Sequence, residues 1–551
     1  MGQASQGQAS QGQASQGQTS HEEPDQQSVE VFDTTLRDGL QVEGVSATVD
    51  DKLRIAEQLD YLGVHYIEGG WPGANPKDIE FFARAATELS LSTSTMVAFG
   101  STRRPRGKVD DDATLRNLLD ANTSAVCIVA KSWDYHVLEA LQTTLDEGEA
   151  MIADSVAFLV GAGRRVLVDM EHFFDGYKRN PEFSLRALEA AVVKGASHVV
   201  LCDTNGGSLP HEVQAIVADV KRHVGNDVII GIHCHDDTGC AVANSMAAVL
   251  AGARQVQGTL NGLGERTGNC NLTTVIPNLQ LKLGVQCLPP GRLERLTAVS
   301  HHVAEVLNRP LNPQAPYVVS SAFAHKAGLH VSAIVRAKDA YEHVDPELVG
   351  NGTRFIVSEM AGRATIQMKA EELGLPMDGP AVNQVIDDLK RLEHEGYHFE
   401  AADASLELLM RRAAGWQQDY FRVESMRVIT DEATSGAFTT EATVKVWVPA
   451  GENAQRHVFT AEGNGPVNAI DSALRAAVGS AYPQLAKVHL TDYKVRILDG
   501  ATATGAITRV LIDATNGERS WTTIGVSANI IEASWRALEE SLIYGLLHAP
   551  S

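Results

Sequence analysis

The chain has 551 residues and a formal net charge of −23, with 44% hydrophobic and 21% charged residues. This length predicts several domains at roughly 150 residues each, and the composition excludes wholesale disorder, collagen and coiled coil. The negative charge disfavours nucleic acid as a partner, and no apolar run approaches the roughly 20 residues that a membrane span needs.

The first part of the chain is a low-complexity tail. Residues 2–20 repeat a GQASQ unit three times and then lose it. Because such a run cannot offset the entropy of ordering it, we expect disorder over residues 1–28, with a partner-binding arm as the alternative. The tail also lacks the basic start and apolar core of a secretory signal. The six cysteines form no CxxC pair, which predicts reduced thiols in a cytoplasmic protein.

From Val29 the sequence alternates β-rich runs with amphipathic helical runs. We predict eight strands, at 29–33, 65–69, 93–99, 125–130, 165–170, 198–203, 228–235 and 255–260. These runs are apolar without alternation, which is typical of a parallel sheet covered by helices. Eight such units predict a closed (β/α)₈ TIM barrel over residues 29–284. A doubly wound open sheet is the alternative.

Two further regions follow the predicted barrel. Residues 285–415 are mostly helical with Pro-rich joints, and from residue 416 the sequence is again β-rich. Here TAEGNGPVNAIDSAL at 460–474 resembles TTIGVSANIIEASW at 522–535, and each combines a strand end, a glycine loop and an amphipathic helix. This duplication predicts a pseudo-symmetric α+β domain over 416–551, whose helix N-termini can hold a small carboxylate. A duplication without a ligand is the alternative.

Polar side chains follow several predicted strands where each strand ends. Arg37 and Asp38 follow the first strand in DTTLRDGLQ, Glu171 the fifth in DMEHFFDGY, and Thr204 the sixth in CDTNGG. The seventh strand ends in IHCHDD, and the eighth runs into NGLGERTGN. Because the reactions of such barrels occur at the carboxyl ends of the strands, these side chains are candidate functional residues.

His233 and His235 indicate a metal site. Residues two apart on a strand share one face, and a divalent cation makes the pairing of two imidazoles favourable. Asp38 and the carboxamide of Asn269 would complete a set that suits octahedral Mg²⁺, Mn²⁺ or Zn²⁺ with open positions for substrate. Coincidence is the alternative for such a pair. Cys234, between the two histidines, is expected to face the helices and to pack there.

Arg37 has two interpretations. It is either an ion-pair partner of Asp38 or Glu171, or it stabilises, together with the metal, the enolate or alkoxide that forms on a carbonyl oxygen. We favour the second interpretation. The hydroxyl of Thr204 is placed where it can bind a substrate carboxylate, whereas Asp203 could cap the next helix and is not included among the site residues.

The motifs DTTLRDGLQ, HCHDDTG and NGLGERTGN together resemble those of the α-isopropylmalate, homocitrate and citramalate synthases. That group contains acetyl-CoA-dependent Claisen condensing enzymes related to 3-hydroxy-3-methylglutaryl-CoA lyase, and the resemblance runs from residue 29 nearly to the end. The segments EGGWPGANPKD, AKSWDYHV and MEHFFDGYKRNP are most similar to those of the long-chain citramalate synthases. The closing duplicated domain is similar to their regulatory domain, which binds an amino-acid end product.

The resemblance implies roles for individual residues. It implies that the metal ligands are Asp38, His233, His235 and Asn269, that Arg37 polarises the keto group, and that Glu171 and Thr204 contact the 2-oxo acid. After the barrel, SSAFAHKAGLHVSAI contains His330 at the position of the catalytic histidine, which pairs with Glu265 of the GER motif. Tyr341 is a further catalytic candidate. Val42 departs from the smaller residue that relatives often carry after Gln41.

The implied reaction condenses acetyl-CoA, as co-substrate, with pyruvate and hydrolyses the thioester to (R)-citramalate and CoA, for isoleucine biosynthesis. The implied assembly is a homodimer with isoleucine as a possible effector. The first alternative is an α-isopropylmalate synthase, which uses 2-oxoisovalerate as the acceptor. The second alternative is a lyase, which cleaves its substrate. The lyases, however, carry a cysteine in the glycine loop that here reads GERTGN. An inactive amino-acid sensor is the alternative outside the enzymes.

Overall fold

The computed structural model describes residues 28–549 except 227, 327–329, 331–332, 335, 338–340, 359, 433, 435, 450–453 and 499–504. The disorder predicted for the N-terminal tail therefore falls almost entirely outside the described residues. The chain divides into two compact units, one reaching Ala322 and including Pro346–Asn351, the other formed by Phe323–Asp345 and the residues from Gly352 onward. The boundaries expected at residues 284 and 415 stay predictions.

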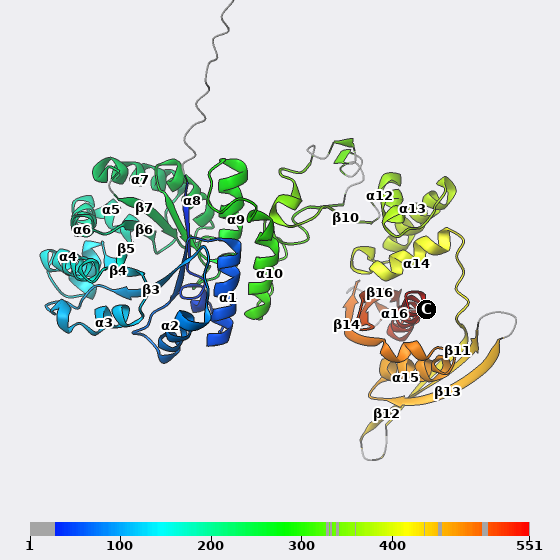
Figure 1. Cartoon of the computed structure of the whole chain (residues 1–551). Coiled ribbons are helices and arrows are strands. Elements are labelled where there is room, and N and C mark those ends of the chain that lie inside the picture. The colour runs from blue at the N-terminus through cyan, green and yellow to red at the C-terminus, as the bar shows by residue number, and fades with distance from the viewer. Residues whose placement is uncertain are drawn as a thin grey trace, which may run out of the picture. The chain divides into compact units, whose positions relative to one another are not determined.

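The first unit contains a closed barrel of eight parallel strands, joined in chain order with β8 paired to β1 (Figure 1). The strands are β1 Glu30–Asp33, β2 Tyr66–Gly70, β3 Thr95–Ser101, β4 Ala125–Lys131, β5 Arg165–Glu171, β6 His198–Asp203, β7 Ile229–Cys234 and β8 Gln255–Gly258. Each predicted strand overlaps one of these, so the (β/α)₈ barrel is confirmed.

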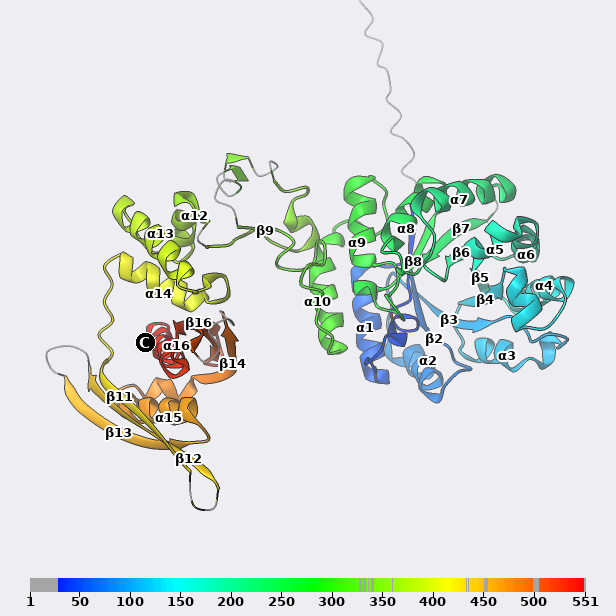
Figure 2. The same ribbon diagram turned by 180° about the vertical axis from the view of Figure 1, so that it is seen from behind.

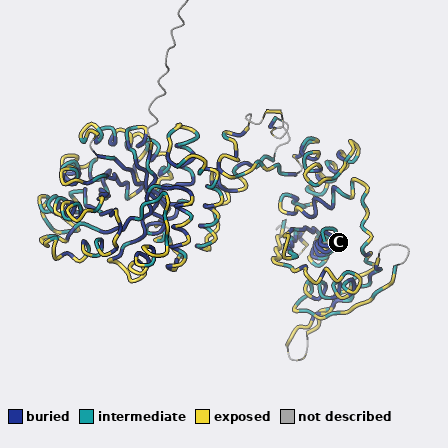
Figure 3. Tube along the Cα trace, in the orientation of Figure 1, coloured by how far each residue is buried: buried dark blue, intermediate teal, exposed yellow. Residues whose placement is uncertain are grey.

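Helices surround the barrel, whose strands are largely buried (Figure 3). They are α1 Val49–Leu62, α2 Pro76–Glu88, α3 Ala113–Asp120, α4 Leu145–Gly161, α5 Phe173–Arg179, α6 Pro181–Val193, α7 Pro210–Val224, α8 Ala241–Leu250, α9 Leu272–Pro277 and α10 Leu296–Val306. Local sequence fixes several of their ends. Thr48 and Asp51 form a capping box at the start of α1, and Gly63 ends this helix with a φ of 96° that favours glycine.

The barrel interior is packed with side chains rather than open. One face of five adjacent strands contributes a single buried cluster, consisting of Phe32, Tyr66, Val97, Phe99, Ala125, Cys127 and Leu167. Because side chains alternate along a strand, the same face continues two residues further with Glu68 and Asp169. Both carboxylates are buried, so the interior becomes polar toward the carboxyl ends of the strands.

The second unit begins with two short paired strands and a helical region. These are β9 Ala324–His325, β10 Arg354–Phe355, α12 Arg363–Glu372, α13 Gly379–His394 and α14 Asp403–Ala413. Val382, Val385 and Leu389 lie on one side of α13 in a buried cluster with residues of α12 and α14. The mostly helical character predicted for this region is therefore confirmed for α12 to α14.

Two related β-β-β-α units complete the chain, as seen from behind in Figure 2. The first comprises β11 Arg422–Glu432, β12 Phe438–Val448, β13 Gln455–Gly463 and α15 Pro466–Gly479, and the second comprises β14 His489–Ile497, β15 Thr508–Thr515, β16 Ser520–Ser527 and α16 Ile530–Leu547. Each sheet is antiparallel. The predicted duplication is thus visible in the fold.

The two duplicated helices begin differently. Asn529 precedes α16, and its Oδ1 accepts a hydrogen bond from the backbone N–H of Ile531 at 2.9 Å. Asn468, its counterpart in the aligned sequence, lies inside α15, which starts at Pro466. Its Oδ1 accepts from the N–H of Asn464 at 3.1 Å. In the described part of the chain, every helix is too short or too polar to cross a bilayer.

Candidate active site

The loop after β1 is anchored by a buried carboxylate at the strand end. Asp33 accepts hydrogen bonds from the backbone N–H and the hydroxyl of Thr35, at 2.8 and 2.9 Å. The Thr35 hydroxyl in turn accepts from the N–H of Leu260, after β8, at 2.9 Å. These bonds tie the loop after β1, which contains Arg37 and Asp38, to the loop after β8.

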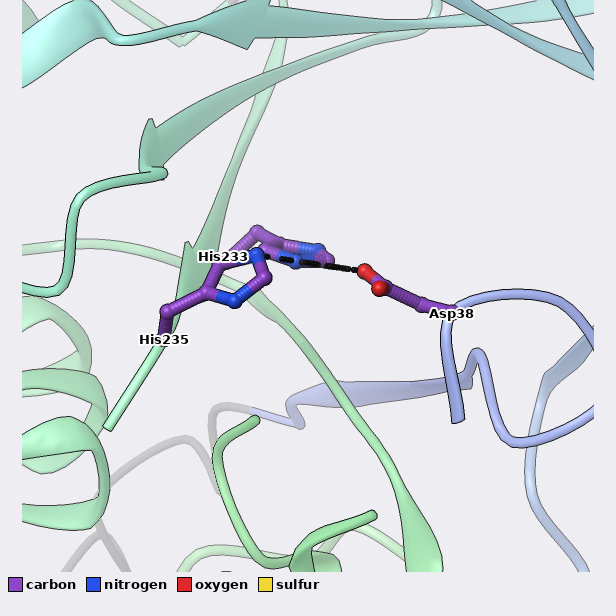
Figure 4. A group of neighbouring side chains, drawn as sticks. All are labelled: Asp38, His233 and His235. Carbon is purple, nitrogen blue, oxygen red and sulfur yellow. Dashed lines mark ion pairs between the residues drawn. The ribbon is translucent and has the colours of Figure 1, made fainter. Parts of the chain in front are cut away.

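Asp38 faces the two histidines of the seventh strand segment across the carboxyl end of the barrel (Figure 4). Asp38 Oδ2 lies 3.3 Å from His233 Nε2 and 4.0 Å from His235 Nε2. One ligand atom from each of the three side chains lies within 4.8 Å of the other two, and all three residues are at most 4% exposed. The structure thus brings together three of the four predicted metal ligands.

The charges in this group strongly shift its protonation. Burial opposes ionisation of Asp38, but the Arg37 charge and the hydrogen bond and charge of His233 hold the pKa of Asp38 well below its ordinary value. Burial likewise disfavours charge on His233, yet its hydrogen bond to Asp38 and the Asp38 charge raise the pKa of His233 to about 9. Burial and the His233 charge lower the pKa of His235 to about 4. A cation bound between these side chains would therefore replace the proton on His233 Nε2, the nitrogen that faces Asp38.

Asn269 lies beside these residues because the loop after β8 folds back over the end of β7. Asn269 forms a β-bridge with His235, and its Nδ2 donates to the carbonyl of Leu263 at 3.2 Å. Two glycines make this turn possible. Gly268 has a φ of 99°, and a Cβ added there would collide with a backbone oxygen, while a Cβ at Gly264 would collide with Asn269 Nδ2.

The donor set fits a divalent cation. Among the buried side-chain atoms of the described residues, Asn269 Oδ1 has no hydrogen-bond partner. A buried polar atom without a partner is costly unless a ligand satisfies it. Two imidazoles, a carboxylate and a carboxamide are mixed nitrogen and oxygen donors that suit a catalytic cation better than a closed thiolate zinc site.

Arg37 is oriented by a carboxylate that the sequence did not single out. Its Nε donates to Glu68 Oε2 at 2.6 Å, and its Nη1 lies 3.5 Å from Asp38 Oδ2. The guanidinium also stacks over the Phe99 ring, 3.9 Å from its centroid. The alternative interpretation named Asp38 and Glu171 as ion-pair partners. The pair with Asp38 is present, whereas Glu171 pairs with Lys131 of β4.

Glu171 and Thr204, the candidate contacts of a 2-oxo acid, lie at the ends of β5 and β6. The hydroxyl of Thr204 accepts from the N–H of His172 at 3.0 Å. The carbonyl of Thr204 accepts from Arg266 Nη2 at 2.7 Å. Cys234 is buried, in agreement with its predicted packing role.

The three candidate proton-transfer residues lie in different units. Glu265 belongs to the first unit, where its Oε1 accepts from Arg266 Nη1 at 2.7 Å. His330 and Tyr341 belong to the second unit, and their rings stack with centroids 4.3 Å apart. The structure therefore brings His330 and Tyr341 together, and the pairing of His330 with Glu265 stays a prediction.

Three buried polar residues near the cluster escaped the sequence analysis: Glu68, Asp169 and Gln257. Glu68 could have been found, because it lies near the carboxyl end of β2. Glu171 was selected as a candidate because it lies at the carboxyl end of its strand. Asp169 and Gln257 lie within strands β5 and β8, and nothing in the sequence indicates that they meet.

Comparison with known families matches three segments of the chain. Residues 28–303 match the HMGL-like family, residues 318–397 match the homocitrate synthase post-HMGL domain-like family, and residues 400–546 match the LeuA allosteric (dimerisation) domain. The described barrel lies within the first segment, and both β-β-β-α units lie almost entirely within the third.

Individual relatives match over nearly their whole length. The chain is 54% identical over 525 residues to an (R)-citramalate synthase of Streptomyces coelicolor, covering 95% of this chain and 97% of the relative. It is 51% identical over 524 residues to that of Aquifex aeolicus, covering 95% and 98%. A probable 2-isopropylmalate synthase of Methanopyrus kandleri is 32% identical over 517 residues, covering 92% and 96%.

The Asp33 anchor predicts a pH dependence of stability. Burial raises the pKa of Asp33 from 3.8 to about 7. Between these pH values the folded state retains a proton that the unfolded state has released. The free energy of unfolding therefore falls by about 1.4 kcal/mol per pH unit from this group alone, and the decrease stops above the folded pKa.

In Asp33→Asn this contribution is absent, so the stability of the variant relative to wild type should rise between about pH 5 and pH 7. Pulse proteolysis in urea at several pH values measures that difference. A difference that stays constant over this range would contradict the assignment.

Proposed function

Because this chain belongs to the family of the (R)-citramalate synthases, we propose that it is a transferase that condenses acetyl-CoA with pyruvate and releases (R)-citramalate and CoA. One observation carries the proposal. Five (R)-citramalate synthases are 46–54% identical to the chain over 94–95% of its length, whereas the 2-isopropylmalate synthase of Pyrococcus furiosus is 30% identical.

The proposed cofactor is a divalent cation, Mg²⁺, Mn²⁺ or Zn²⁺, held by Asp38, His233, His235 and Asn269. The proximity of the first three residues and the unpartnered Oδ1 of Asn269 support this assignment. When bound, the cation supplies Lewis-acid polarisation of the 2-oxo group of pyruvate.

Arg37 supplies a second positive charge at the same oxygen. Burial disfavours this charge, but Glu68 and Asp38 raise the pKa of Arg37 above its ordinary value, so the guanidinium stays charged. Glu68 and the Phe99 ring also fix its direction. A charged donor held in place before reaction stabilises the alkoxide that forms on the keto oxygen. Glu171 and Thr204 bind the remainder of the 2-oxo acid.

The proposed base is His330, paired with Glu265, and Tyr341 assists it. His330 removes a proton from the methyl group of acetyl-CoA, and the resulting carbanion attacks the keto carbon of pyruvate. The new carbon–carbon bond gives citramalyl-CoA once the alkoxide is protonated. Water then attacks the thioester, the carbon–sulfur bond breaks, and CoA leaves as the thiol. Loss of the thioester makes the overall reaction irreversible.

The proposed organisation is a catalytic barrel over residues 29–284, helical subdomains over 285–415 and a regulatory domain over 416–551. The match to the LeuA allosteric (dimerisation) domain supports a homodimer with an amino-acid effector in the last domain, and isoleucine is the proposed effector. A cytoplasmic location agrees with six free cysteines, of which five are buried.

The acceptor specificity is the first test. We expect kcat/KM for pyruvate to exceed that for 2-oxoisovalerate by at least about 100-fold, because a pocket shaped for a methyl group must rearrange to admit an isopropyl group. Release of the CoA thiol, followed with a chromogenic disulfide, measures both rates. Faster turnover of 2-oxoisovalerate would overturn the proposal in favour of a 2-isopropylmalate synthase.

Removal of one metal ligand is the second test. In His233→Ala, Mn²⁺ affinity should fall by more than about 100-fold, and turnover should be lost. Removing a residue that only orients a ligand already lowers metal affinity by up to about 100-fold, and removing the ligand itself should cost more. Equilibrium dialysis and the thiol assay measure the two effects. His223→Ala is the matched control, because His223 lies on α7 and pairs with Glu189 at the surface. Retained activity in His233→Ala would exclude the proposed site.

A further inference from the structure

His233 is one end of a chain of buried hydrogen bonds across the barrel interior. Its Nδ1 lies 2.8 Å from Oε1 of Gln257 on β8, and Gln257 Nε2 donates to Oδ1 of Asp169 on β5 at 3.1 Å. The three residues are at most 4% exposed. These hydrogen bonds reach His233 from the side opposite Asp38. They involve Nδ1, whereas Asp38 faces Nε2.

The direction of these hydrogen bonds follows from Asp169. Asp169 Oδ1 accepts from Gln257 Nε2, and the Cys127 sulfur lies within 4.8 Å of an Asp169 carboxyl oxygen. An accepting Asp169 requires the amide nitrogen of Gln257 to face it, which leaves the amide oxygen facing His233.

An amide oxygen can only accept a hydrogen bond, so His233 Nδ1 must be the protonated nitrogen. His233 Nε2, which faces Asp38, is then the nitrogen left to bind a cation. We propose that Gln257 and Asp169 are positioning residues that hold His233 with its Nδ1 protonated and its Nε2 presented to the divalent cation. This inference rests on the metal site of the proposed function. It adds two residues, Gln257 and Asp169, that orient the ligand His233.

The alternative is that Gln257 only fills space in the barrel. Gln255 provides the matched comparison, because it lies two residues earlier on β8, on the same face and also fully buried. Its Nε2 bonds Glu30 at 3.3 Å, at the opposite end of the barrel, and its Oε1 has no hydrogen-bond partner among the described residues. A leucine at either position removes a buried glutamine amide, but only at position 257 does it remove a contact to a metal ligand.

The first experiment compares Gln257→Leu with Gln255→Leu in the full chain. Titration with Mn²⁺, with free Mn²⁺ measured by electron paramagnetic resonance, gives the dissociation constant of each protein. We expect it to rise 10–100-fold in Gln257→Leu, the effect typical of removing a residue that orients a metal ligand, and to change less than about twofold in Gln255→Leu. At saturating Mn²⁺ the kcat of Gln257→Leu should recover substantially. Wild-type affinity in Gln257→Leu would overturn the inference.

The second experiment exchanges the amide and the carboxylate. In Asp169→Asn the new amide can donate to Gln257 and turn its nitrogen toward His233, and in Gln257→Glu two carboxylates face each other. Both single variants should bind Mn²⁺ at least about tenfold more weakly. In the double variant, the carboxylate introduced at position 257 accepts from His233 Nδ1 and from the amide introduced at position 169. His233 Nδ1 therefore stays protonated, and this variant should bind within about threefold of wild type.

The outcomes distinguish failure of the positioning role from failure of the metal site. Equal Mn²⁺ affinity in the wild type and all variants of positions 169 and 257 would overturn the positioning role while leaving the metal site intact. A double variant no better than the worse single variant would show that Asp169 and Gln257 act by packing alone. If the wild-type protein binds no Mn²⁺, the proposed metal site itself fails.

Discussion

The site depends on one buried electrostatic contact, between Asp38 in the loop after β1 and His233 on β7. A carboxylate that is almost fully buried is stable only when positive charge compensates it. Arg37 and the protonated His233 provide that compensation in this structure. Glu68 and Asp169 are two further buried carboxyl groups whose charges act on the Arg37 guanidinium.

The barrel supplies the geometry that this contact requires. Its parallel strands all present their carboxyl ends at one mouth, so loops distant in sequence converge there. The Asp33–Thr35–Leu260 hydrogen bonds join the loops after β1 and β8, and two constrained glycines allow the latter loop to place Asn269 against His235. The candidate metal ligands therefore all lie in the barrel, while the segment that matches the LeuA allosteric (dimerisation) domain is a separate part of the chain.

Much of the fold was predictable, because its signals are local. Unalternating apolar runs predicted all eight strands of the barrel, and the two-residue period of a strand placed His233 and His235 on one face. The partners of these residues were harder to predict. Arg37, in the loop after β1, donates to Glu68 on β2, a partner that neither interpretation of Arg37 included. The contact between Gln257 and Asp169 joins β8 to β5 across the interior, and no periodicity within either strand encodes such a pairing.

The most direct measurement is a crystal structure of the protein grown with Mn²⁺, with diffraction data collected at a wavelength where manganese scatters anomalously. The account predicts one anomalous peak at the carboxyl end of the barrel, within coordination distance of Asp38, His233, His235 and Asn269, with His233 bound through Nε2. A peak elsewhere in the chain, or none at saturating Mn²⁺, would contradict it.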